Sequence, residues 1–218
     1  MGTITRSFAN NITTSGVLLP ASLTNNSIAN VTAYNAAVST GNMVLVSSAT
    51  ASASASIEFT LGSYKEYQFY FINIHPSAEG GNTYFEFNLS TDNGSNYNVA
   101  KTSTYIEVYH DEADTATALQ YSTAHDLAQG TGMQRLITGL GSDNDQGNSG
   151  FMSLFNPAST TYVKHFMSNM NRTYFGDYTG QDIVAGYANT TSALTNIKFQ
   201  ISGGANIDDG IILMYGIN

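Results

Sequence analysis

The sequence predicts an all-β protein, a jelly-roll-like antiparallel β-sandwich with an extended N-terminal arm. Thr, Ser and Asn supply 70 of the 218 residues, and these side chains favour strands and turns because they compete for backbone hydrogen bonds inside helices. Short apolar or alternating segments recur from residue 43 to the end of the chain, separated by Gly, Asn and Pro. Many short strands without a longer internal repeat are typical of a sandwich.

Residues 1–40 carry single apolar residues scattered among Thr, Asn and Ser, with no sustained period. We interpret them as an arm that lies on a neighbouring subunit and is ordered by it, the alternative being a pair of ordinary edge strands. Residues 41–218 form the sandwich domain.

The segment 64–74 is expected to be a central strand. Tyr67, Phe69 and Phe71 alternate onto one face, and Tyr70 with its neighbours supplies apolar residues to the other. A strand that is apolar on both faces is buried on both.

The segment 83–89 alternates with a period of two, and Asn93-Gly94 follows it. Because Asn and Gly tolerate positive φ, this pair predicts a hairpin. Gly203-Gly204 and Asp208-Asp209 predict a second hairpin before the last strand.

The remaining strand predictions follow the same criteria, with one short helix expected over 116–127. The other predicted strands are 43–48, 57–61, 104–109, 135–138, 151–155, 161–167, 183–187, 195–201 and 211–217.

Charge and composition exclude several classes of function. The net charge is −9 and only 11% of residues are charged, so the chain has the wrong sign to bind nucleic acid or an anionic membrane. It contains no cysteine and hence no disulfide or thiolate chemistry. No apolar run is long enough to span a membrane, and the N-terminus lacks the pattern of a secretory signal, so we expect synthesis and release in the cytoplasm.

No motif of an enzyme active site is present, and we expect neither catalysis nor a cofactor, although a site assembled from distant loops leaves no local pattern. The densest charge cluster contains His110, Asp111 and Asp114. Its oxygen ligands could hold a divalent cation. The favoured interpretation is a solvated loop without a metal.

Four tyrosines in or beside predicted loops are the candidates for contact with a glycan or a partner: Tyr105, Tyr109, Tyr174 and Tyr178. A tyrosine ring stacks on sugars or fills an interface while its hydroxyl forms hydrogen bonds. The alternative is that they are core and edge residues.

Three stretches resemble a group of tailed-bacteriophage virion proteins. They are the closing segment 194–217, which ends in Leu213-Met214-Tyr215-Gly216-Ile217, the segment 85–97, and the segment 150–157. The chain departs from the pattern at Asn93, where Gly is commoner, and at Met214. Residues 1–40 lie outside the resemblance.

The resemblance implies a jelly-roll-like, non-enzymatic structural protein located in the virion. The expected function is a capsid decoration (cement) protein that stabilises the head shell through oligomeric packing, with a homotrimer favoured and the major capsid protein or other virion proteins as partners. The alternative is a tail-fibre or receptor-binding protein that recognises host glycans. A third class, a glycan-cleaving enzyme, would need clustered carboxylates in a groove.

Overall fold

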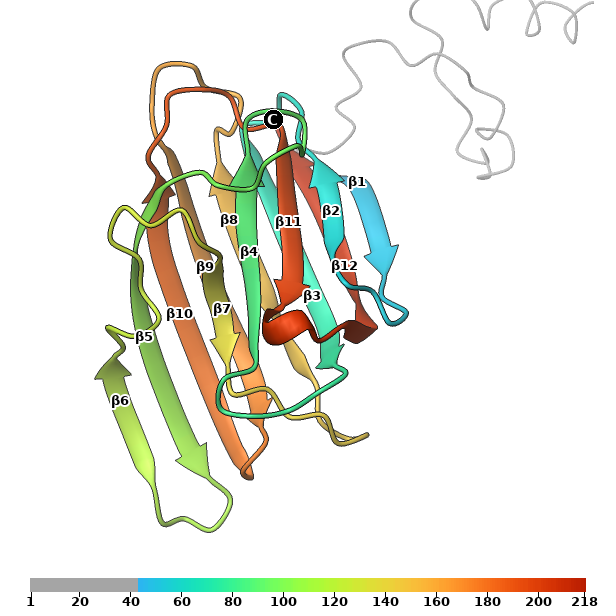
Figure 1. Cartoon of the computed structure of the whole chain (residues 1–218), viewed down its shortest axis with the longest axis vertical. Helices are drawn as coiled ribbons and strands as arrows, with labels where there is room; N and C mark the ends of the chain where they lie inside the picture. The colour runs from blue at the N-terminus through green and yellow to red at the C-terminus, as the bar shows by residue number, and fades with distance from the viewer. Residues whose placement is uncertain (1–42) are drawn as a thin grey trace, which may run out of the picture. The chain divides into compact units, whose positions relative to one another are not determined.

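The computed structural model describes residues 43–218, which form two antiparallel β-sheets (Figure 1). The predicted arm, residues 1–40, lies outside the described residues. The elements are β1 (Met43–Thr50), β2 (Ile57–Thr60), β3 (Glu66–Pro76), β4 (Tyr84–Ser90), β5 (Lys101–Asp111), β6 (Thr117–Tyr121), β7 (Gln134–Thr138), β8 (Asn148–Phe155), β9 (Lys164–Tyr174), β10 (Tyr178–Ala188), β11 (Asn196–Ile201), the short 3₁₀-helix η1 (Ser202–Gly204) and β12 (Ile207–Ile217).

The strand order is that of a jelly roll with two inserted hairpins. The larger sheet has the order β1-β12-β3-β8-β9-β10-β5-β6, and the smaller has the order β2-β11-β4-β7. Strands β1, β12, β3 and β8 therefore face the four strands of the smaller sheet, and the chain crosses repeatedly between them. The hairpins β5-β6 and β9-β10 widen the larger sheet to eight strands. The predicted all-β, jelly-roll-like fold class is confirmed.

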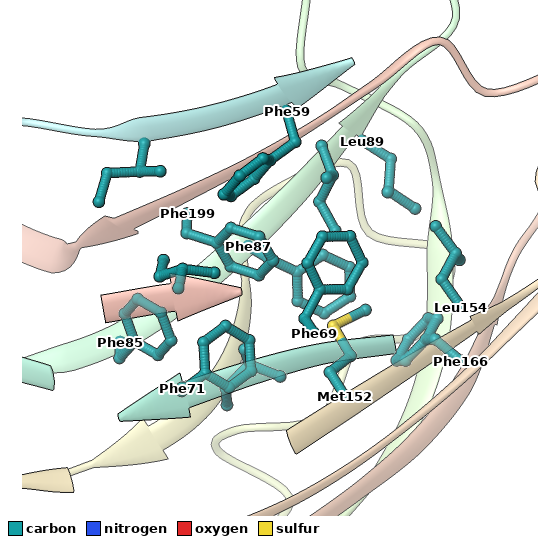
Figure 2. Close-up of a cluster of buried hydrophobic side chains, with 14 of the residues drawn as sticks. Phe59, Phe69, Phe71, Phe85, Phe87, Leu89, Met152, Leu154, Phe166 and Phe199 are labelled. Atoms are coloured by element: carbon teal, nitrogen blue, oxygen red, sulfur yellow. The ribbon is translucent and has the colours of Figure 1, made fainter. Parts of the chain in front are cut away.

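Aromatic side chains from both sheets fill the space between them (Figure 2). The ring of Phe71 on β3 lies 5.2 Å from Phe85 on β4 and 5.2 Å from Phe199 on β11, both edge to face. Phe87 on β4 meets Phe166 on β9 at 5.1 Å. Each fully buried ring contributes about 1.5–3 kcal/mol. These contacts join the two sheets into one core.

The central position of β3 is confirmed, since it pairs with β12 on one side and β8 on the other. Tyr67, Phe69 and Phe71 are buried as predicted. The expected burial of the opposite face is wrong, because Tyr70 and Ile72 lie on the outer face of the larger sheet and are partly exposed. The alternation then shifts at Asn73, which has φ +51° and sits in a β-bulge. An extra residue in a strand reverses which side chains face inward, so Ile74 joins the core.

The helix predicted over 116–127 is wrong. Thr117–Tyr121 forms β6, which pairs with β5 from Ile106–Tyr121 to His110–Thr117. The edge of β5 presents unpaired backbone N–H and C=O groups that can bind another strand. A short helix at residues 116–127 would leave this edge unpaired and would be only marginally stable by itself. Pairing with this edge therefore prevails over local helix propensity.

The two predicted hairpins are wrong in their pairing, although one turn has the expected backbone. Asn93 and Gly94 both have positive φ, +59° and +81°, but the next strand, β5, lies in the other sheet from β4. Likewise β11 and β12 lie in different sheets, and η1 with Gly203 at φ +71° connects them. These turns carry the chain across the sandwich.

The smaller sheet covers only part of the larger one. Its edge strand β7 packs against β9 and β10, and β5 and β6 extend the larger sheet beyond β7 (Figure 1). The loop 122–133 covers part of this extension, where Leu127 N donates to Ser103 Oγ and the imidazole of His125 lies 5.1 Å from the Tyr105 ring. The rest of the inner face of the extension is open.

Candidate functional site

A cleft with a volume of about 250 Å³ lies on this open inner face. Three of its lining residues are tyrosines, and the others are two oppositely charged residues and an amide. They are Glu107, Tyr109, Gln120, Arg172, Tyr174 and Tyr178.

Strand register brings these residues together. Tyr174 on β9 is paired with Tyr178 on β10. Two residues further along these strands, Arg172 on β9 is paired with Gly180 on β10. Gly180 is also paired with Tyr109 on its other neighbour, β5. A Cβ at Gly180 would lie 2.3 Å from Arg172 Nε. Because this position has no side chain, the arginine can lie across it toward β5.

The tyrosines form the walls of the cleft. The Tyr178 ring meets Tyr109 at 5.7 Å and Tyr174 at 5.6 Å, both edge to face. Tyr174 lies directly against the backbone of Gly139, where a Cβ would be 1.7 Å from the ring. Gly139 also has φ +63°, so both space and conformation require glycine there. The wall at Tyr174 is therefore held in place from behind.

A buried ion network forms the floor. Arg172 Nη2 lies 2.6 Å from Glu107 Oε1, and Nη1 lies 3.5 Å from Asp182 Oδ2. Arg172 Nη1 also donates to the carbonyl and hydroxyl oxygens of Thr138 on β7. Gln120 Nε2 donates to Glu107 Oε2 at 2.9 Å. The network thus ties β5, β6, β9 and β10 to the edge of the smaller sheet.

The carboxyl groups of Glu107 and Asp182, which both contact Arg172, have pKa values shifted in opposite directions. Burial raises the pKa of Asp182 to about 7, against the opposing charge of Arg172. Burial also acts to raise the pKa of Glu107, but hydrogen bonds from Gln120 and Arg172 outweigh it and the pKa lies below its ordinary value. Glu107 is therefore the carboxylate that more readily carries the negative charge beside the arginine, and Asp182 holds its proton to a higher pH than an ordinary aspartate.

Three of the four predicted tyrosines, Tyr109, Tyr174 and Tyr178, lie together in the cleft, half-buried. The expectation of a surface contact is wrong for Tyr105, which is fully buried. Its side chain points inward from β5 under the loop 122–133. Burial, reinforced by the charge of Asp182, raises its pKa.

Sequence reasoning missed Glu107, Gln120 and Arg172. Arg172 lies on the inward-facing set of β9, after Phe166 and Met170. A charged residue in a core-facing position needs a partner, and this signal alone could have marked it.

The residues of the predicted charge cluster do not converge. His110 Nε2 lies 3.1 Å from Asp114 Oδ1, but the Asp111 carboxylate accepts hydrogen bonds from Thr115 and Ala116 within its own turn. Hydrogen bonds from these residues lower the pKa of Asp111. Across residues 43–218 no group of three His, Asp or Glu side chains could hold a metal ion, and the cation site is not formed.

The outer face of the larger sheet is a second candidate surface. Its middle row crosses all eight strands without an acidic or basic side chain, and every residue in it is at least partly exposed. The row is Ser48, Leu213, Tyr70, Phe151, Asn169, Ile183, Ile106 and Tyr121.

The rows on either side also carry no acidic or basic side chain, and their residues are at least partly exposed apart from the buried Ser153. One is Leu45, Tyr215, Gln68, Ser153, Met167, Ala185 and Thr104, and the other includes Ile211, Ile72, Ser149, Asn171, Gln181, Val108 and Leu119. We call the three rows the uncharged face. Eight strands spaced about 4.8 Å apart make it about 34 Å wide. The acidic residues nearest to this face lie close to strand ends: Glu66 at the start of β3, and Asp208 and Asp209 near the start of β12.

The fold and these two surfaces define the class: a jelly-roll protein with a widened sheet, an uncharged outer face and an aromatic cleft inside the widened part. Comparisons with protein-family models, curated proteins and solved structures found no match. The described part of the chain contains no helix long and apolar enough to cross a membrane.

Proposed function

We propose that the protein is a non-enzymatic structural component of a phage particle, a decoration protein that stabilises the head shell by packing against identical neighbours and the shell. The uncharged face is the observation that carries this proposal. The segments 85–97, 150–157 and 194–217 resemble virion proteins, and this resemblance supports assigning the protein to a phage particle.

Charge distribution explains why this face would be the contact surface. With a net charge of −9, two copies repel each other wherever their acidic surfaces approach. The uncharged face removes that repulsion, and interface cores are depleted of charged residues. Over three rows the face covers roughly 700 Å², close to the about 800 Å² that each partner buries in a standard interface.

Side-chain entropy also favours assembly through this face. Short Ser, Thr and Asn side chains and ring-containing Tyr and Phe lose less conformational freedom on ordering than Lys or Glu. Exposed apolar residues such as Phe151 and Met167, which are 41% and 56% accessible, gain from being covered.

A receptor-binding role in a tail fibre is the second candidate, and the tyrosine cleft favours it. The two candidates differ in stoichiometry, because a shell presents many equivalent sites and a tail presents few.

Copy number per particle tests the proposal. Particles from the phage that encodes the chain would be purified, and the protein quantified against the major capsid protein. Copies in the hundreds are expected. A low number would overturn the decoration role in favour of the tail, and complete absence from purified particles would overturn both.

A further inference from the structure

We propose that the cleft between β9, β10, β5 and β6 binds a single ring of a neutral carbohydrate. This ligand site goes beyond the assembly role, which uses the opposite face of the same sheet. The cleft stands on the inner face, whereas the uncharged face is formed by the alternate residues of the same strands.

Size limits the ligand. A volume of about 250 Å³ corresponds to the space of about eight water molecules, below the range of about 300–1,000 Å³ for drug-sized ligands. The cleft therefore suits one six-membered ring, with any further rings outside it.

The walls suit a ring that has both an apolar face and hydroxyl groups. Tyr109, Tyr174 and Tyr178 supply aromatic surface to stack on the C–H face of a sugar. In the described residues, the tyrosine hydroxyls that form hydrogen bonds are those of Tyr67, Tyr70, Tyr84, Tyr97, Tyr121 and Tyr187, and none of these lines the cleft. The hydroxyls of the three cleft tyrosines are therefore free to donate to and accept from sugar hydroxyls, which do both.

The charges of the floor select against an anion. The guanidinium of Arg172 is buried and already engaged by Glu107, Asp182 and Thr138. Glu107, whose lowered pKa keeps it ionised, is the partly exposed charge, and its side chain is 12% accessible against 3% for Arg172. An acidic sugar would meet this carboxylate and a net charge of −9. A neutral sugar can donate hydroxyl protons to it.

The cleft is also preorganised. Tyr174 is held against Gly139, and the ion network fixes the floor. Little conformational entropy is then lost when a ligand enters.

Isothermal titration calorimetry of the full chain tests this inference, with the methyl glycosides of glucose, galactose and mannose as probes and N-acetylneuraminic acid as the anionic comparison. We expect saturable binding of at least one neutral glycoside, with a Kd in the millimolar range, as about 4 kcal/mol of binding energy gives. Tyr178→Ala should weaken it at least tenfold. Tyr162→Ala, which removes a 71% exposed tyrosine outside the cleft, should leave the Kd unchanged.

Tyr109→Ala provides a second variant if Tyr178→Ala does not fold, and it should weaken binding in the same way. The inference is overturned if no neutral glycoside binds, if the acidic sugar binds more tightly, or if Tyr162→Ala weakens binding as much as the cleft variants. None of these outcomes bears on assembly, which copy number and sedimentation measure separately.

Discussion

Arg172 Nη2 lies 2.6 Å from Glu107 Oε1, across the intervening strand β10. The two residues are 65 positions apart in the chain, and Arg172 is 3% accessible. Their contact connects the inserted hairpins β5-β6 and β9-β10 to each other and, through Thr138, to the smaller sheet. The ion pair is therefore both the floor of the cleft and a structural link.

Replacing Arg172 by Met should destabilise the protein strongly. The change leaves Glu107 and Asp182 without their cation, and breaking a buried ion pair from one side costs about 3–5 kcal/mol. Urea unfolding at pH 7 measures this. The matched control is Lys198→Met, which removes a more exposed ion pair with Glu58 at 3.8 Å and should cost at most about 1 kcal/mol. Equal losses in the two variants would contradict the account.

Asp182→Asn should change how stability depends on pH. The folded-state pKa of Asp182 is raised from 3.8 to about 7, so between these values the folded state holds a proton that the unfolded state has released. The stabilisation of the folded state that comes from this bound proton is fully present below about pH 4 and is lost as pH rises through 7. The variant should therefore gain stability relative to the wild type across this range. Unfolding free energies at pH 4, 5.5 and 7 test it, and a constant difference would refute it.

Lys101→Met should also be more stable than the wild type, but its gain in stability should fall as pH rises, which is the opposite of the trend for Asp182→Asn. Burial lowers the pKa of Lys101 to about 7, and within residues 43–218 its Nζ donates to two neutral acceptors, Asn88 Oδ1 and the Val99 carbonyl. The lysine destabilises the fold below pH 7, and this penalty shrinks as pH rises toward 10.5. The variant should be more stable than the wild type by about 1–3 kcal/mol at pH 6, with a smaller gain at pH 9. An equal gain at both pH values would rule out this assignment.

Gly139→Ala should disturb the cleft wall. The new methyl group would overlap the Tyr174 ring, and φ at this position is +63°, so a loss of more than about 1 kcal/mol is expected. Gly132→Ala is the control, because a Cβ added there would have nothing within 4 Å of it, and the change should stay within about 0.5 kcal/mol. Thermal unfolding compares the two. A tolerated Gly139→Ala would show that Tyr174 is not held there.

The local alternation of apolar and polar residues predicted where strands form better than it predicted which strands pair with one another. The alternation around Phe69 and Phe71 correctly indicated a central strand, since β3 pairs with β12 and β8. Its second apolar face, with Tyr70 and Ile72, is not covered by another layer and forms part of the partly exposed outer face. The turn at Asn93-Gly94 has the predicted positive φ values. Its local geometry is compatible with either a hairpin or a crossing between sheets, so sequence could not decide which sheet receives β5.

The candidate site was only partly predictable for a related reason. Tyr109, Tyr174 and Tyr178 were selected as residue types suited to recognition, but nothing in the sequence indicated that β5 and β10 pair so that Tyr109 opposes Gly180. Tyr105 and Tyr109 share one strand face, four residues apart. The loop 122–133 buries the first and leaves the second open, a long-range effect that a local pattern does not contain.

Sedimentation velocity of the full chain, wild type against Met167→Glu, tests the central claim that the uncharged face is an assembly surface. Met167 is 56% accessible in the flanking row beside Asn169, so a carboxylate there would bring like charges together on neighbouring copies. Thr91→Glu, in the exposed turn after β4, adds the same charge elsewhere. We predict that the wild type and Thr91→Glu form the same oligomer and that Met167→Glu sediments as a monomer. A monomeric wild type, or an oligomer unchanged by Met167→Glu, would contradict the account.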